Sequence, residues 1–210
     1  IEEVQLAGLC LKKIIKEGKI KGKNTYISIP SPEALIVLFE MPEMAKEDLD
    51  QAVKFEAHKY VPVSSMEDVV ISWDLVGLSL KNYSTESNSA SNPNNKSEKM
   101  AQILLVAASK KRVEKREEVV KNVGLKLKSI EVENFALARS LVGSDQGNFV
   151  IVEIGSTICN IILVEKGIIK SNRNVDAGGS DITRIISSSL QIDEKRVEQM
   201  KISGENFFGS

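Results

Sequence analysis

The segment between Asn148 and Val175 restricts the fold more than any other part of this chain. Two runs of β-branched and aliphatic residues flank the short polar turn Gly155-Ser156-Thr157, and a third run follows the turn at Glu165-Lys166-Gly167. Strands joined by turns this short pair in antiparallel order. The sequence therefore predicts a three-stranded antiparallel meander, with strands over residues 148–154, 158–164 and 168–175.

The turn at Gly155-Ser156-Thr157 allows two interpretations. It is an ordinary hairpin turn, or it is a loop whose backbone amides and hydroxyl groups converge on a phosphate. The pair Gly178-Gly179 follows the meander and permits a sharp entry into a helix that Ser180 or Asp181 would cap. The amino end of such a helix favours an anion, although a capped helix after a sheet needs no ligand. From these residues alone the ordinary hairpin is the simpler interpretation.

Charge and composition exclude several kinds of function. The 210 residues include 28 basic and 29 acidic side chains, so the net charge is −1 and does not favour a nucleic-acid partner. The single histidine, His58, is expected on the surface, and the sequence holds no catalytic triad, metal-ligand cluster or Walker-type loop. Cys10 and Cys159 lie far apart, which fits a reduced, cytoplasmic setting. No apolar run is long enough to cross a bilayer.

The rest of the chain alternates between strand and helix patterns. A helix is expected from Ile1, where apolar residues recur at helical spacing without a capping residue before them. The predicted strands cover residues 26–29, 34–39, 69–76, 102–108 and 125–132. The predicted helices cover residues 46–60, 110–123, 134–142, 181–190 and 193–201. Residues 81–99 are polar enough to form a mobile hairpin loop, and the charged run from Lys110 is interpreted as a solvated helix start in which acidic residues are interleaved.

The helix over residues 46–60 has an unusual apolar face. Leu49, Val53 and Ala57 share that face, and Glu56 lies in the middle of it. A carboxylate in such a position needs a partner, so it pairs across an interface or else reaches water at the edge of the helix. Both interpretations remain open. Trp73 and Cys159 are most simply packing residues within strands.

Three segments of the sequence, taken in order, resemble the family of the type IV pilus assembly protein PilM, which is actin-like and related to the cell-division protein FtsA. They are "FEMPEMAKEDLDQAVKFEAHKYVPVSSMEDVVISWDLVG", "LLVAASKKRVEKREEVVKNVGLKLKSIEVENFALARSL" and "FVIVEIGSTICNIILVEKGIIKSNRNVDAGGSDIT". The third is similar to the family's second phosphate loop, in which an arginine, here Arg173, stands five residues before Gly178-Gly179. The sequence departs from the family where Glu153 replaces an aspartate and Cys159 replaces a threonine.

The resemblance implies an α/β fold that is a partial actin-like (ribonuclease H-like) architecture. Residues 1–31 and 109–144 would form an incomplete first actin-like subdomain, and residues 145–210 would begin the second. Residues 32–108 would form the inserted strand-helix-strand-strand (SHS2-like) subdomain of FtsA and PilM. The chain resembles the middle of such a protein, without the first phosphate loop and without the adenosine-binding segment.

The resemblance also implies a function, a cofactor and a set of partners. It implies a cytoplasmic scaffold, peripheral to the inner membrane, that holds the amino-terminal tail of a PilN-like membrane protein and contacts other pilus platform proteins. Phe55, Glu56 and Tyr60 are the candidates for binding the tail, and a homo-oligomer is a further expectation. The full-length protein would bind ATP and Mg²⁺, and no catalytic or metal-ligating residue is assigned in this chain. The candidate nucleotide-binding residues are Glu153, Gly155, Ser156, Thr157, Gly178 and Gly179.

Two alternative functions follow from the same resemblance. One is a filament-forming ATPase of the FtsA kind that hydrolyses ATP actively. The other is the cytoplasmic part of a type II secretion platform protein, which shares the architecture.

Overall fold

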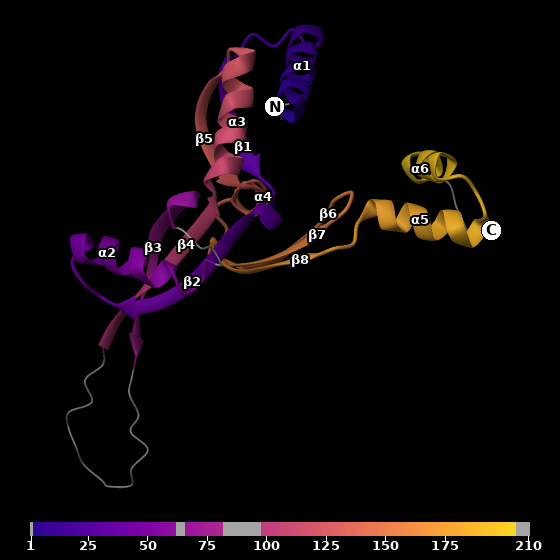
Figure 1. Cartoon of the computed structure of the whole chain (residues 1–210). Coiled ribbons are helices and arrows are strands. Elements are labelled where there is room, and N and C mark those ends of the chain that lie inside the picture. The colour runs from indigo at the N-terminus through magenta and orange to yellow at the C-terminus, as the bar shows by residue number, and fades with distance from the viewer. Residues whose placement is uncertain (1, 62–65, 82–97, 205–210) are drawn as a thin grey trace. The chain divides into compact units, whose positions relative to one another are not determined.

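The computed structural model describes residues 2–61, 66–81 and 98–204, and these residues form a mixed α/β fold (Figure 1). The chain divides into two compact units, Ile1–Leu141 and Val142–Ser210. The first unit contains two sheets and the second unit contains one. The predicted loop over residues 81–99 falls almost entirely outside the described residues.

One sheet of the first unit consists of β1 (Asn24–Ile29) and β5 (Lys126–Val132), which are parallel. Helix α1 (Glu2–Glu17) confirms the helix that the apolar spacing predicts at the start of the chain, and it packs against α3 (Lys110–Val123) (Figure 1). Helix α3 ends at Gly124, whose φ of +77° suits a glycine C-cap. Helix α4 (Glu133–Leu141) follows β5 directly.

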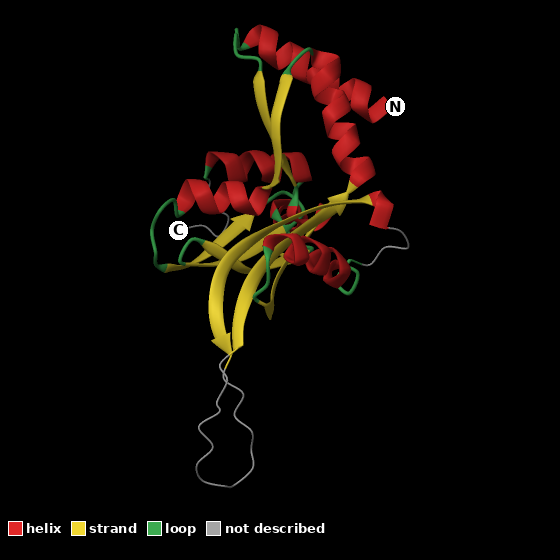
Figure 2. Ribbon diagram, turned by 90° about the vertical axis from the view of Figure 1, so that its left-hand side faces the viewer, coloured by secondary structure: helices red, strands yellow, loops and turns green. Residues whose placement is uncertain are grey.

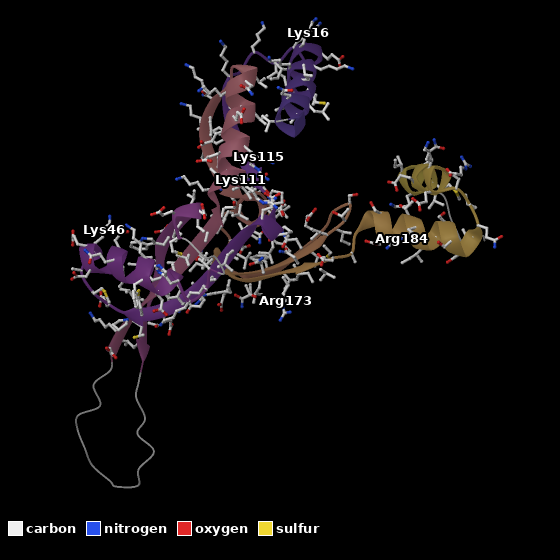
Figure 3. The ribbon with its side chains drawn as sticks, in the orientation of Figure 1. Lys16, Lys46, Lys111, Lys115, Arg173 and Arg184 are labelled. Atoms are coloured by element: carbon white, nitrogen blue, oxygen red, sulfur yellow. The ribbon has the colours of Figure 1, made fainter. Side chains whose placement is uncertain are left out.

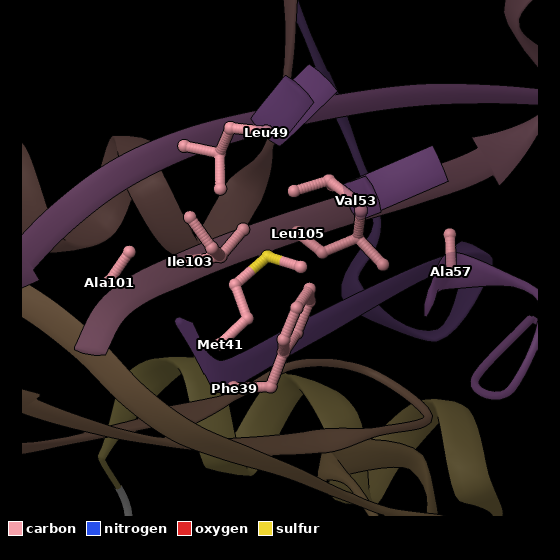
Figure 4. Packing of buried hydrophobic residues seen from close by; sticks show 8 residues of the cluster. All are labelled: Phe39, Met41, Leu49, Val53, Ala57, Ala101, Ile103 and Leu105. Atoms are coloured by element: carbon pink, nitrogen blue, oxygen red, sulfur yellow. The ribbon is translucent and has the colours of Figure 1, made fainter. Parts of the chain in front are cut away.

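The second sheet of the first unit has the antiparallel order β2–β4–β3. Its strands are β2 (Ala34–Pro42), β3 (Val69–Lys81) and β4 (Glu98–Ser109), and the short helices η1 (Ser31–Glu33) and η2 (Met66–Asp68) precede β2 and β3. β3 and β4 are the long curved pair in Figure 2. Helix α2 (Lys46–Ala57) covers one face of the sheet through its apolar stripe. The buried cluster between them is shown in Figure 4 and contains Phe39, Met41, Leu49, Val53, Ala57, Ala101, Ile103 and Leu105.

Several element ends in the first unit differ from the sequence prediction. The predicted helix over residues 46–60 ends at Ala57, and the amide of Tyr60 bonds the carbonyl of Ala57 in a closing turn. The amides of His58 and Lys59 likewise bond carbonyls three residues back, so the helix tightens to 3₁₀ geometry in its last turn. Strand β2 continues through Pro42, since β2 is an edge strand and a missing amide on its free side breaks no ladder bond.

The second unit contains the predicted antiparallel meander of β6 (Asn148–Ile154), β7 (Cys159–Glu165) and β8 (Ile168–Val175). Lys166 and Gly167 join β7 to β8 with φ angles of +51° and +77°, which is the conformation of a type I′ hairpin turn. Two helices follow, α5 (Gly179–Leu190) and α6 (Glu194–Ser203). The prediction for this part of the chain is confirmed to within two residues at every element end.

Candidate functional site

The structure brings the turn between β6 and β7 into contact with the start of α5. The amide of Gly179 donates to the carbonyl of Gly155 at 2.9 Å, and the amide of Ser180 donates to the carbonyl of Ser156 at 2.8 Å. The hydroxyl oxygens of Ser156 and Ser180 lie 2.8 Å apart. The turn at Gly155-Ser156-Thr157 and the start of α5, both singled out in the sequence, are therefore joined through their backbones.

Gly178 is the residue that permits this contact. A Cβ atom at Gly178 would lie 2.5 Å from the carbonyl oxygen of Ser156 and 2.7 Å from that of Gly155. No side chain fits there, because both neighbouring atoms belong to the backbone. The glycine is thus needed for the packing of two loops, whether or not a ligand binds beside them.

The amino end of α5 differs from its sequence prediction in one respect. Gly178 is the N-cap, and the side chain of Asp181 accepts a hydrogen bond from the amide of Gly178 at 2.9 Å, which is one half of a capping box. Neither Ser180 nor Asp181 occupies the cap position. Because the first amides of α5 already bond Asp181 and the turn, they are not available to an anion in this arrangement.

A cleft of about 540 Å³ opens beside the turn, within the second unit. The turn and the start of α5 supply one wall, through Gly155, Ser156, Gly179 and Ser180. The opposite wall is polar and comes mainly from α6. Its residues are Thr183, Glu194, Lys195, Glu198 and Lys201.

Lys201 holds the two walls of this cleft together. Its ammonium group donates to the carbonyl of Gly179 at 2.9 Å, to the hydroxyl of Thr183 at 2.7 Å and to the carboxylate of Glu198 at 2.9 Å. Sequence reasoning missed both Glu198 and Lys201. Their spacing of three residues on a helix places them on one face, but nothing local indicates that this face meets the Gly178-Gly179 pair.

Other predicted nucleotide-binding residues lie outside the lining of this cleft. Glu153 is half-buried on β6, and its carboxylate oxygen Oε1 lies 3.3 Å from the place that a Cβ on Gly155 would take. Thr157 is exposed at the tip of the turn. Arg173 is exposed on the edge strand β8 (Figure 3). Of the six predicted residues, Gly155, Ser156 and Gly179 line the cleft, whereas Glu153, Thr157 and Gly178 do not.

The carboxylate of Glu198 is held in its ionised form. The hydroxyl of Thr183 donates to it at 2.6 Å, and this bond, followed by that from Lys201, holds the pKa of Glu198 below its ordinary value of 4.5. A carboxyl group with a lowered pKa in the folded state binds its proton less tightly there than in the unfolded chain. It contributes stability above its unfolded pKa, and that contribution is lost as pH falls through the folded pKa.

Glu198→Gln should therefore make the free energy of unfolding of the second unit less dependent on pH under acidic conditions. We expect the wild-type protein to lose stability as pH falls below 4.5, the ordinary pKa from which that of Glu198 is lowered, and the variant to lose less over the same range. Hydrogen exchange of the α5 and α6 amides at several pH values measures this. Glu194→Gln is the matched control, because Glu194 lines the same cleft from the same helix. An equal change in both variants would contradict the role given to Glu198.

The three residues predicted to bind a partner have different environments. Phe55 is 73% exposed on α2. Glu56 is half-buried and its carboxylate pairs with the ammonium group of Lys59 at 2.8 Å, so its partner lies on its own segment. The ring of Tyr60 stacks on that of Phe39 with centroids 5.4 Å apart. Tyr60 thus closes one end of the core under α2.

A separate apolar cleft of about 340 Å³ lies where η1 and the sheet β2–β4–β3 meet the start of α3. None of the three predicted partner-binding residues lines it. It adjoins a second cleft of about 600 Å³ between α1 and α3, and the two clefts share Glu33 and Ser109. The lining of the apolar cleft is Pro32, Glu33, Ala34, Leu35, Val61, Asp68, Val69, Ala107, Ala108 and Ser109.

Two further properties limit the chemistry of the described residues. No group of three or more histidine, cysteine or acidic side chains is placed to hold a metal ion in the part of the chain that the structure describes. Among the helices of that same part, none has the length and hydropathy of a membrane span.

This chain resembles known proteins both in sequence and in fold. The family model of the type IV pilus assembly protein PilM matches residues 1–207. A chain of the solved PilM–PilN type IV pilus biogenesis complex is 18% identical, with a TM-score of 0.74 over 99% of this chain and 59% of that one. This chain therefore spans about three fifths of the length of that relative. The fold expected from the resemblance, α/β and actin-like, is confirmed.

Two other solved structures match with lower TM-scores. The cytoplasmic domain of EpsL, an inner-membrane component of the type II secretion system of Vibrio cholerae, is 13% identical with a TM-score of 0.49, over 89% of this chain and 63% of that one. The ethanolamine utilization protein EutJ of Carboxydothermus hydrogenoformans is 27% identical with a TM-score of 0.38, over 43% of this chain and 32% of that one.

Proposed function

The chain belongs to the family of the type IV pilus assembly protein PilM, and from that premise we propose that it is part of a cytoplasmic scaffold that holds the tail of a PilN-like inner-membrane protein. The similar solved chain comes from a complex of PilM with PilN. Contacts with other platform proteins and self-association belong to the same proposal. They would make this protein a connecting part of the pilus platform.

The apolar cleft beside η1 is the observation that carries this proposal. It lies at the border between the predicted first subdomain and the predicted insert, and the resemblance to the PilM family implies that the tail binds in a groove between these two. Leu35, Val69 and Ala107 give it apolar walls, while Glu33 and Asp68 supply acceptors for backbone amides. An extended peptide with apolar side chains fits such a surface, because it buries those side chains and keeps its backbone hydrogen-bonded. We place the tail in this cleft rather than on the outer side of α2.

A peptide titration separates these two positions. The probe is a labelled synthetic peptide with the amino-terminal sequence of the PilN-like protein from the same organism. Leu35→Ala should weaken binding roughly ten-fold, because one buried leucine contact is lost. Phe55→Ala and Glu56→Ala should change the affinity less than about two-fold. The opposite pattern would move the tail to α2, and no saturable binding by the wild-type protein would remove the proposal.

We also propose that the full-length protein binds ATP with Mg²⁺ at the cleft of the second unit. The residues present there fit part of such a ligand. The hydroxyl groups of Ser156 and Ser180 can donate to a phosphate, and the carboxylate of Glu198 can accept from sugar hydroxyls. Bound Mg²⁺ would neutralise phosphate charge that the lining, with two cations and two carboxylates, does not balance. The proposal is limited to binding, because Glu153 does not line the cleft.

A further inference from the structure

Lysine side chains gather at one end of the first unit. This end consists of residues 16–24, which include the end of α1 and the start of β1, and residues 121–128, which include the end of α3 and the start of β5. The two segments lie side by side, because Asn24 pairs with Lys126 and the amide of Lys126 donates to the carbonyl of Lys23 at 2.7 Å (Figure 1). We call them together the lysine-rich end. Its lysines are Lys16, Lys19, Lys21, Lys23, Lys121, Lys126 and Lys128.

The lysine-rich end has a large net positive charge. Every side chain of its two segments is described, and all seven lysines are exposed. Its one acidic residue is Glu17, whose carboxylate pairs with the ammonium group of Lys13 at 3.9 Å. Glu118, three residues before Lys121, is the nearest acidic residue along α3. When Lys13 and Glu118 are counted as well, eight lysines and two glutamates leave a net charge of +6.

Helix stability accounts for only two of these lysines. Lys16 and Lys121 lie in the last turns of α1 and α3, where the helix dipole favours a cation. The other five lie outside the helices. Solubility does not require the cluster either, because interspersed charges of both signs serve that purpose. Like charges gathered at one end repel one another, and an anionic partner would offset that repulsion.

The backbone at Lys19 is a second observation. Lys19 has a φ of +51°, a left-handed conformation that favours glycine, and it closes α1 in a Schellman turn in which the amide of Ile20 donates to the carbonyl of Ile15 at 3.0 Å. Helices α3 and α6 end on glycines in the same conformation, Gly124 and Gly204. The backbone therefore does not select a lysine at this position, and a role for the side chain explains it better.

We propose that the lysine-rich end binds the anionic surface of a lipid bilayer. Its lysines come from two helix ends, a turn and two strand starts, so they suit a broad surface rather than one small anion. None of the seven cations is an arginine, whose planar fork suits bidentate bonds to single carboxylates or phosphates. Lysine is a point charge on a flexible stem, and clusters of lysines are attracted by anionic headgroups. Ile20 lies between Lys19 and Lys21 and is 52% exposed, so an apolar side chain is placed to enter the interface.

This contact goes beyond the proposed scaffold, in which the chain reaches the membrane only through the tail of a partner. Each lysine beside an anionic leaflet contributes a modest attraction, so the lysine-rich end alone would bind weakly and reversibly. Together with a bound tail it would hold the first unit against the bilayer more firmly than either contact does alone. The inference does not depend on tail binding, because vesicles that contain no protein test it.

Sedimentation of the purified protein with lipid vesicles is the test. Vesicles of phosphatidylcholine mixed with phosphatidylglycerol should bind the protein, whereas vesicles of phosphatidylcholine alone should not. Added salt should weaken the binding, because it screens exposed charges. Lys19→Glu combined with Lys21→Glu should lower the partition coefficient at least about ten-fold, since two attractions near the surface become repulsions.

The matched control is Lys46→Glu combined with Lys166→Glu, which causes the same change in net charge. Lys46 begins α2, well apart from Lys16 (Figure 3). Lys166 is exposed and has the same φ of +51° as Lys19, so the control carries the same backbone strain. We expect the control to change the partition coefficient less than about two-fold. Circular dichroism confirms that each variant is folded, and Lys21→Glu combined with Lys23→Glu replaces the first variant if the change at Lys19 disturbs the turn.

Three results would overturn the proposal. Equal losses in the test and control variants would mean that the vesicles respond only to net charge. Absence of binding to the phosphatidylglycerol vesicles at low salt would exclude a bilayer as the partner. A polyglutamate peptide and a short single-stranded DNA are tested in parallel. If either binds in a manner that depends on Lys19 and Lys21 while the vesicles do not, the lysine-rich end recognises an acidic protein or a nucleic acid instead.

Discussion

Replacing Gly178 with alanine is expected to lower the free energy of unfolding of the second unit by about 3 kcal/mol. The added Cβ atom would lie 2.5 Å from the carbonyl oxygen of Ser156 and 2.7 Å from that of Gly155. Both atoms belong to a turn that is fixed at each end by strands β6 and β7, so neither can move aside at low cost. The turn and the start of α5 must separate instead, and the two backbone hydrogen bonds between them are then lost.

Hydrogen exchange of the amides in β6, β7 and α5 measures this effect within the second unit. Gly179→Ala is the matched control, because a Cβ there would lie no closer than 3.6 Å to any neighbour, which is ordinary contact. We expect a change within about 0.5 kcal/mol for the control. Equal losses in the two variants would show that the cost arises in the first turn of α5 and not in its contact with the β6–β7 turn. If ATP binds beside the turn, Gly178→Ala should also weaken nucleotide binding by the full-length protein, whereas Gly179→Ala should not.

The sequence predicted the meander of the second unit well because its signals are local. Strand alternation and short turns determine antiparallel neighbours without reference to the rest of the chain. Strand ends in the first unit were less well predicted, since they depend on pairing partners that are distant in sequence. Strands β3 and β4 pair as far as Lys81 and Glu98, past a register shift between Leu75 and Gly77, whereas the alternation in β3 suggested an end at Val76.

The candidate site was predicted only in part, for a physical reason. Turn residues and a glycine pair can be recognised in a sequence, so Gly155 and Gly179 could be assigned to the same candidate site. The opposite wall of the cleft depends on how α6 packs against α5, and no local pattern shows that Lys201 meets the carbonyl of Gly179. The division of the chain into three subdomains and the roles of the site residues stay predictions.

Partner surfaces were the hardest to predict from local patterns. Glu56 within an apolar stripe suggested an interface, yet its carboxylate pairs with Lys59 three residues away. The charged run on α3 suggested only a solvated helix, because basic and acidic side chains are interleaved in its sequence. Helical geometry sorts them onto different faces, and only contact with α1 and η1 turns one of those faces into a cleft.

Leu105→Ala is expected to be the other most costly substitution, at about 3 kcal/mol of unfolding free energy for the first unit. Leu105 is fully buried on the central strand β4, between Val37 of β2 and Trp73 of β3. It belongs to the cluster that α2 covers (Figure 4). Removing three methyl or methine carbons there loses their burial and leaves a cavity that three hydrogen-bonded strands cannot close.

Urea unfolding followed by the fluorescence of Trp73, the single tryptophan of the chain, reports this loss. The indole nitrogen of Trp73 donates to Asp50 on α2 at 3.0 Å, so the signal responds to separation of α2 from the sheet. The control is Leu78→Ala on β3, where the leucine is 60% exposed and the expected cost is within about 0.5 kcal/mol. A similar cost for both variants would contradict the assignment of the core to the α2 side of the sheet.

Because β4 runs directly into α3 through Ser109, a loosened core should also disturb both clefts that share Ser109. Leu105→Ala should therefore also weaken the binding of the PilN-like tail, although Leu105 does not line the apolar cleft.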